Sequence, residues 1–194
     1  MGHAPPQQAT RPTSSSSSRS GHTQSVKGTE RGGWHGYDGG KKVYGVKRHL
    51  MVDTLGLVLA VCVSPADVGD RDGAEVLLAR SAGKFPRLRH LWADQGYRGR
   101  EFLDGIRENT GITIQVVQRR DGGFRRTWVR DGDTPPPVPR FAVVPRRWVV
   151  ERSFAWLGRY RCLSKDYEYL ADTSESAVYL ATITLLLHRT TTPT

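Results

Sequence analysis

Apolar residues along this chain fall into short runs separated by polar turns, a pattern that is typical of buried strands. Residues 47–52 and 57–63 are rich in aliphatic and β-branched side chains, and the Asp-Thr-Leu-Gly sequence between them predicts a β-hairpin. Residues 88–93 form a compact apolar run, and residues 112–117 alternate apolar and polar positions. Both segments therefore predict further strands.

Four other segments carry apolar residues at helical spacing, and they predict helices. They are residues 73–82, 99–109, 147–161 and 175–188. Thr173 or Ser174 precedes the last segment, and both residue types are common helix N-caps. The order of these elements along the chain predicts an α/β layer fold: strands come first, strands and helices then alternate, and helices come last.

Two segments lack such a pattern. Residues 1–21 are of low complexity and include five consecutive serines, a composition that predicts a disordered tail. Residues 118–140 form a long insert of Arg, Gly and Pro, which predicts a basic loop. The remaining pattern predicts one folded domain over residues 22–190 that is long enough to bury a core.

The charge of the chain favours a polyanionic partner. The 194 residues carry a formal net charge of +10, and residues 119–165 hold twelve Lys or Arg against four Asp or Glu. Arginines interleaved with aromatic rings suit phosphate contacts and base stacking on nucleic acid. A merely basic protein or a ribosomal RNA-binding protein is the alternative. Trp148 and Trp156 can also be core anchors, and we expect this role for Trp156.

Cysteine content and hydropathy indicate in which cellular compartment the chain is expected. Cys62 and Cys162 make neither a disulfide framework nor a zinc motif, which predicts a cytoplasmic location. The longest apolar run, residues 177–187, is shorter than the roughly 20 residues of a membrane span. The first residues contain no apolar segment of a secretory signal. We therefore expect no membrane partner.

Asp94 is the first candidate catalytic residue. It stands at the end of a predicted strand whose apolar composition is typical of a buried one. It precedes a glycine-containing turn, residues 95–99, that leads into a helix. Open α/β sheets bind ligands at the carboxyl ends of their strands, so this position favours function. An aspartate that merely caps the turn or the helix is the more frequent case.

Glu151 is the second candidate. On a helical projection of residues 147–161 the apolar side chains share one face, and Glu151 lies on the other with Arg147, Arg152 and Arg159. We predict that these arginines and Lys165 contact DNA. The alternative is an ordinary solvated face on which Glu151 pairs with Arg147 across one helical turn.

Three blocks of the sequence resemble the catalytic core of bacterial insertion-sequence DDE transposases, closest to the insertion sequence four and five families. Residues 41–74 resemble the front half of that core. Residues 90–99 (HLWADQGYRG) resemble its second-acid motif, which assigns the catalytic Asp to Asp94. Residues 145–168 resemble its third-acid helix, which assigns the catalytic Glu to Glu151.

The resemblance implies a fold, a metal site and a reaction. The expected fold is RNase H-like and retroviral integrase-like, a mixed sheet flanked by helices. Asp94 and Glu151 would bind two Mg²⁺ or Mn²⁺ ions, which activate the attacking oxygen and stabilise the leaving oxygen of a phosphodiester. The reaction would cut double-stranded DNA at the ends of a mobile element and join it to target DNA, with the enzyme acting as a homodimer.

The first acid of that family is missing at its expected place. The family usually reads Asp-Ser-Gln-Ser-Val-Lys, whereas residues 22–27 read His-Thr-Gln-Ser-Val-Lys, so His22 replaces the Asp. We interpret this as a change of reading frame just before Thr23 or as a decayed copy. Asp38 and Asp53 are spare acids, but both lie in turn-like sequence. A catalytically inactive DNA-binding remnant is therefore the alternative hypothesis.

Overall fold

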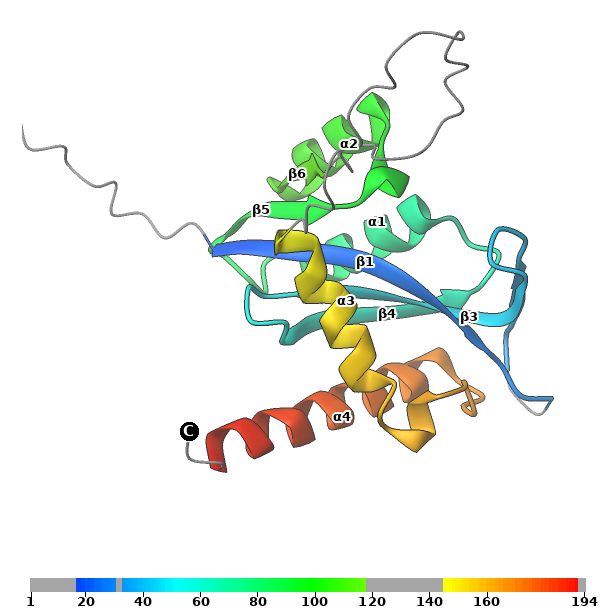
Figure 1. Ribbon diagram of the computed structural model, residues 1–194. Coiled ribbons are helices and arrows are strands. Elements are labelled where there is room, and N and C mark those ends of the chain that lie inside the picture. Colours follow the sequence, from blue (N-terminus) through cyan, green and yellow to red (C-terminus); the bar gives the residue numbers. More distant parts are fainter. Residues whose placement is uncertain (1–16, 31–32, 118–144, 192–194) are drawn as a thin grey trace, which may run out of the picture.

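The computed structural model describes residues 17–30, 33–117 and 145–191, and its centre is one mixed β-sheet (Figure 1). The strands of the described residues are β1 (Ser17–Lys27), β2 (Gly36–Asp38), β3 (Val43–Val52), β4 (Val58–Pro65), β5 (Leu88–Ala93) and β6 (Thr113–Val116). The helices are α1 (Asp70–Ser81), α2 (Arg100–Thr110), α3 (Pro145–Leu157) and α4 (Ala171–Thr191), with short 3₁₀ turns η1 (Gln95–Tyr97) and η2 (Arg161–Leu163).

The sheet combines an antiparallel half and a parallel half. β3 pairs antiparallel with β1 and with β4, and β2 pairs antiparallel with the first residues of β3. β1 also pairs with β5 and β5 with β6, both in parallel. β1 therefore lies in the interior of the sheet, between β3 and β5.

Helices cover both faces of this sheet. Figure 1 shows α1 and α2 on one face and α3 and α4 on the other. Each face has its own hydrophobic core, and neighbouring residues of β3 alternate between the two. Met51 packs in the core under α1 and α2, whereas Leu50 and Val52 pack in the core under α3 and α4. This alternation follows from the pleat of the strand.

The hairpin and the first helices confirm the predictions from the sequence. β3 and β4 are joined by a turn in which Asp53 Oδ1 accepts the backbone N–H groups of Leu55 and Leu57. Gly56 completes the turn with a φ of 84°. The hydrophobic periodicity also predicted α1, β5, α2 and β6, and the ends of these elements differ from the predicted ranges by a few residues.

The predicted boundary of the tail at residue 21 is wrong, because residues 17–21 belong to β1. Serine and glycine are poor strand formers, so composition alone indicated disorder. The backbone of β1 nevertheless pairs on both sides, and small side chains allow close packing: Ser20 and Thr23 are buried. Residues 1–16 and the predicted loop 118–140 lie outside the described residues.

The last two helices also differ from the prediction. α3 ends at Leu157 rather than at residue 161, because the chain tightens there into turns that lead to η2. α4 begins at Ala171, ahead of the predicted N-cap residues. The Ser174 hydroxyl donates instead to the buried Asp166 carboxylate, at 2.6 Å.

Candidate active site

Asp94 follows the last residue of β5 and begins the turn η1. Its Oδ1 atom accepts the backbone N–H of Gly96 at 3.0 Å, which holds the carboxylate in one orientation. Tyr97, three residues on, belongs to this turn and is buried, as is Thr23 of β1. Burial raises the pKa of the Tyr97 hydroxyl, as do the nearby Asp70 and Asp94 carboxylates, so the phenol stays protonated.

His22 lies beside Asp94. β1 and β5 run in parallel with Ser20 opposite Trp92, so two residues further along each chain His22 meets Asp94. The His22 Nδ1 atom is 3.4 Å from Asp94 Oδ2, and each side chain is 21% exposed. The residue that replaces the family's first acid in the sequence therefore lies next to the second-acid position in space.

Glu151 lies on α3, which packs over the part of β1 that contains His22. Phe154 of α3 makes an edge contact with the His22 ring, with 6.1 Å between ring centroids. Val150 lines a small cavity together with His22 and Asp94. Glu151 follows Val150, and its side chain is exposed. The structure thus brings the helix that carries Glu151 to the His22–Asp94 pair.

The spare acids have other roles. Asp53 caps the β3–β4 turn. Asp38 accepts the Ser25 hydroxyl at 2.6 Å, and this bond is the main reason that the pKa of its carboxyl is lowered. Asp38 also lies 3.9 Å from the Lys47 ammonium group. In these contacts Asp53 serves the turn, and Asp38 is engaged by Ser25 and Lys47 rather than by Asp94.

Asp70 is a neighbour of the site that the sequence did not indicate. A Cβ atom added to Gly96 would lie 3.1 Å from Asp94 Oδ1 and 3.7 Å from Asp70 Oδ2, so the two carboxylates flank the same glycine. Asp70 also pairs with Lys47 at 3.1 Å. An acid in the first turn of a helix is ordinarily explained by the helix dipole, so only the fold reveals this proximity.

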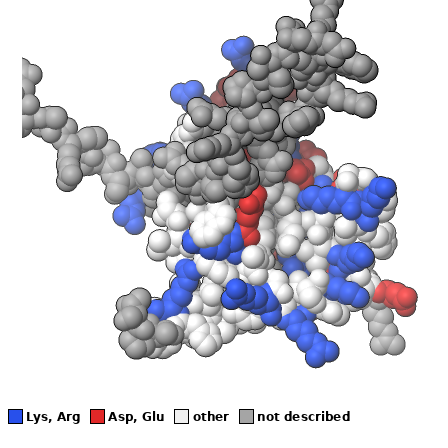
Figure 2. Space-filling model, in the orientation of Figure 1, with Lys and Arg blue, Asp and Glu red and all other residues white. Residues whose placement is uncertain are grey.

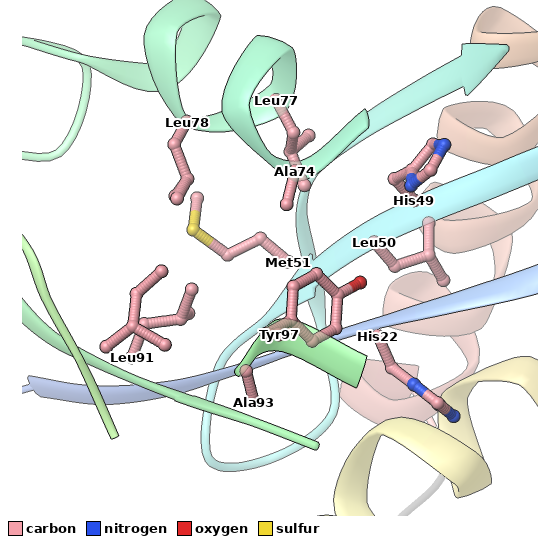
Figure 3. Close-up of a pocket in the computed structure, with 12 residues that line it drawn as sticks. His22, His49, Leu50, Met51, Ala74, Leu77, Leu78, Leu91, Ala93 and Tyr97 are labelled. Atoms are coloured by element: carbon pink, nitrogen blue, oxygen red, sulfur yellow. The ribbon is translucent and has the colours of Figure 1, made fainter. Parts of the chain in front are cut away.

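Two further cavities adjoin the site. The first is a cavity of about 10 Å³ under α1 that is lined by His22, His49, Tyr97 and apolar side chains (Figure 3). It has room for about one water molecule. The second is an open cleft of about 560 Å³, lined by Gly96 and by charged residues including Asp70, Lys47 and Arg71. Of the cavities lined by described residues at this site, the cleft is the one large enough for part of a substrate.

The predicted DNA-binding residues lie on and after α3. Arg159 and Lys165 are exposed. Arg152 is half-buried: it donates to the Leu55 carbonyl at 2.9 Å and stacks between the rings of Trp148 and Trp156. Trp148 is 50% exposed and Trp156 half-buried, so Trp156 is only a partial core anchor. The side chain of Arg147 lies outside the described part.

The family described as Transposase DDE domain matches residues 16–187, which is most of the chain. The chain belongs to this family. The DDE domain is also 27% identical over 135 residues to a protein assigned as the transposase for insertion sequence element IS402 of Burkholderia cepacia. The match covers 66% of this chain and 56% of that relative, so the chain spans little more than half of the relative's length.

Solved structures show the fold of the DDE domain. The simian T-cell lymphotropic virus intasome in complex with PP2A regulatory subunit B56 gamma aligns with 94% of this chain and 52% of its own, at a TM-score of 0.51 and 16% identity. The catalytic core of BIV integrase covers 88% of this chain and 83% of its own, at a TM-score of 0.44 and 16% identity. The alignment with the intasome chain, whose TM-score is above 0.5, confirms the α/β, RNase H-like fold.

The family implies a divalent metal ion, and the donor set departs from what Mg²⁺ prefers. Asp94 and Glu151 offer carboxylate oxygens, which suit Mg²⁺, but His22 offers a ring nitrogen where a carboxylate is expected. Within residues 17–30, 33–117 and 145–191, no three His, Cys, Asp or Glu side chains are grouped so as to hold one ion. The residues present therefore do not complete an all-oxygen pair of sites.

Among the described residues, none of the helices combines the length and the apolar character of a membrane span.

Proposed function

We propose that this DDE domain acts in DNA transposition, as the metal-dependent centre that cleaves and transfers the strands of a mobile element. The proposed catalytic and metal-binding residues are Asp94 and Glu151, with Mg²⁺ or Mn²⁺ as the ion. Such ions, when bound, would supply charge stabilisation to the oxygens of the reacting phosphodiester. The chain's own contribution is to hold one carboxylate at the end of β5 and to bring α3, with the other, to the same place.

The single observation that supports this proposal is the convergence of β1, β5 and α3. The second-acid position, Asp94, lies at the carboxyl end of β5, where open α/β sheets bind ligands. His22 of β1 touches it, and Phe154 and Val150 anchor α3 against the same two residues. Three segments far apart in the sequence thus meet at one solvent-accessible point.

Double-stranded DNA is the proposed partner. Figure 2 shows more Lys and Arg than Asp and Glu side chains on the face that carries α3. Arg159 and Lys165 are exposed there, and Arg147, Arg152 and these two residues are the proposed phosphate contacts. A homodimer that pairs two element ends and a cytoplasmic location remain predictions from the family and from the two free cysteines, Cys62 and Cys162.

His22 favours a second candidate, an inactive DNA-binding remnant. It occupies the place of the first acid beside Asp94, and a neutral or positive imidazole cannot supply the negative charge of a carboxylate. The remnant keeps the basic surface and the fold, so it binds DNA without cutting it.

A strand-transfer assay separates the two candidates. The full chain is incubated with element-end DNA and a target plasmid in Mg²⁺ or Mn²⁺. The active enzyme gives joined products that Asp94→Ala abolishes, because the remaining ligands no longer hold the ion. Asp104→Ala, which removes an exposed carboxylate of α2, is the matched control and keeps the activity. Absence of products in every condition, with DNA binding retained, supports the remnant.

A further inference from the structure

The last helix, α4, is apolar on two opposite sides. Its inner side packs on the sheet through buried residues that include Val178 and Ala181. Its outer side carries Leu180, Ile183 and Leu187, which are 65%, 51% and 59% exposed. A helix on the surface of a domain ordinarily turns a polar face to water. Three large apolar side chains in a row on the outer side therefore indicate a surface that a partner covers.

The spacing of the outer positions is that of a coiled-coil seam. Exposed residues follow one another along α4 at alternating intervals of three and four residues, and they are Thr173, Ser176, Leu180, Ile183, Leu187 and Thr190. This alternation keeps a stripe of side chains facing a second helix. The sequence from residue 176 to residue 187 contains no Lys, Arg, Asp or Glu, so no charge interrupts the centre of the stripe.

The domain holds this outer stripe away from its own core. α4 packs against β4, η2 and α3, and Figure 1 shows the helix at the margin of the molecule with these elements on one side. The Glu175 carboxylate and the Tyr179 hydroxyl accept the backbone N–H groups of Val63 and Val61 on β4. These two bonds fix the rotation of α4 about its axis. Within the described part of the chain, Ile183 is therefore left facing outward.

The charges at the two ends of α4 favour a second copy of the chain as the partner. Asp172 lies in the first turn, and His188 and Arg189 lie in the last. Antiparallel pairing of two α4 helices brings the acidic end of each to the basic end of the other, whereas parallel pairing would bring like charges together. In the antiparallel register, a twofold axis places Leu180 of each copy against Ile183 of the other. DNA fits this stripe poorly, because its centre offers no cation to a phosphate.

We propose that the outer stripe of α4 is a dimer interface, at which two copies of this chain pair antiparallel through Leu180, Ile183 and Leu187. The helix is about 30 Å long, and its apolar seam is short. We therefore expect a dimer that dissociates on dilution rather than a permanent one. The inference goes beyond the proposed function, because this pairing requires neither a metal ion nor DNA and uses neither Asp94 nor Glu151.

Sedimentation velocity of the full chain, without DNA, tests the pairing. We expect a shift from monomer to dimer as the protein concentration rises. Ile183→Asp should raise the dissociation constant of the dimer at least about tenfold, because it places a carboxylate inside an apolar seam. Val76→Asp, at an apolar position of α1 that is 43% exposed, is the matched control and should leave the dissociation constant unchanged. Circular dichroism verifies that both variants are folded.

Cysteine cross-linking tests the direction of the pairing. The parent protein carries Cys162→Ser, because the exposed Cys162 thiol would form disulfides by itself. Thr173→Cys and Thr190→Cys, both at exposed positions, are made as separate proteins, mixed and oxidised. The antiparallel register brings position 173 of one copy to position 190 of the other, so one variant should cross-link to the other. Parallel pairing would cross-link each variant only to itself.

A chain that stays monomeric up to its solubility limit would overturn the proposal, and the stripe would then belong to a different partner. Equal dissociation constants for Ile183→Asp and the parent, or cross-links confined to each cysteine variant alone, would overturn it as well. The strand-transfer assay reports separately on the proposed function. A dimer that joins no DNA supports this inference and contradicts transposase activity. A monomer that joins DNA does the reverse.

Discussion

At the scale of single residues, Arg48 illustrates how a charged side chain is accommodated inside the domain. It lies on β3 and is 1% exposed. Its guanidinium donates to the Leu163 carbonyl at 2.7 Å and lies 3.8 Å from Asp166 Oδ1. Burial lowers the pKa of Arg48, and the Asp166 carboxylate partly offsets that effect. Asp166 therefore supplies the countercharge that keeps this cation in the core.

Removing that countercharge should be costly. We expect Asp166→Ala to lower the free energy of unfolding by about 3–5 kcal/mol, because it leaves a buried cation without its anion and the Ser174 hydroxyl without its acceptor. Asp172→Ala, on the exposed start of α4, should change stability by less than about 0.5 kcal/mol. Chemical denaturation of both variants measures the difference. Similar losses would show that Arg48 does not depend on Asp166.

His49 makes stability depend on pH. It is 1% exposed, contacts the Ser64 hydroxyl at 2.8 Å, and burial lowers the pKa of its imidazole to about 4 from an ordinary value of 6.5. Asp70 raises the pKa and Lys47 lowers it, and both are smaller effects than burial. The folded protein therefore keeps His49 neutral at pH values where the unfolded chain takes up a proton.

The sign of this effect follows from proton uptake. As pH falls from 6.5 to about 4, the unfolded chain binds the proton first, so the free energy of unfolding should fall by roughly 3 kcal/mol. His49→Asn should lack this part of the pH dependence, whatever its stability at neutral pH. Denaturation curves at a series of pH values measure it. Parallel pH profiles for the two proteins would contradict the prediction.

At the scale of elements, local patterns predicted most of the strands and helices but not the polar strand β1. The hairpin of β3 and β4 could be predicted because its turn residues carry their own signal: Asp53 caps the turn and Gly56 takes a positive φ. β1 carries no such signal, since Ser20 and Gly21 are poor strand formers. Its pairing partners β3 and β5 impose the extended conformation.

Gly56 also links the hairpin to α3. Its φ is 84°, and an added Cβ atom would lie 2.9 Å from the Ser153 hydroxyl, which donates to the Gly56 carbonyl. We expect Gly56→Ala to lower the free energy of unfolding by about 1–3 kcal/mol through strain and crowding. Gly39→Ala, at a glycine with nothing within 4 Å, is the control and should have little effect. Thermal unfolding distinguishes the two.

At the scale of the whole molecule, two cores on the two faces of the sheet hold the site together. The core under α3 includes Val150 and Phe154, so packing on one face holds α3, which carries the exposed Glu151, against the sheet. The core under α1 includes Tyr97 and Ala93, so packing on the other face supports the turn that begins at Asp94. Loss of either core would therefore separate the candidate site residues.

DNA binding by the proposed basic surface should depend steeply on salt, because neutralised phosphates release counterions. We expect a combined Arg159→Ala and Lys165→Ala variant to lower the slope of log affinity against log salt by about two. Lys84→Ala removes an exposed cation that follows α1 on the opposite face, and it should leave the slope nearly unchanged. Fluorescence anisotropy at several salt concentrations gives the slopes. Equal changes in both variants would place the DNA elsewhere.

The sequence by itself determined the class of elements, the position of Asp94 after a buried strand and the place of Glu151 on a helix, because each depends on residues close in the chain. Only the tertiary structure decided that His22 touches Asp94, that Asp70 flanks Gly96 and that the Ser-rich segment is an interior strand. These features depend on pairing between segments tens of residues apart. No local pattern records such pairing, since the free energy that stabilises it arises only when the sheet is complete.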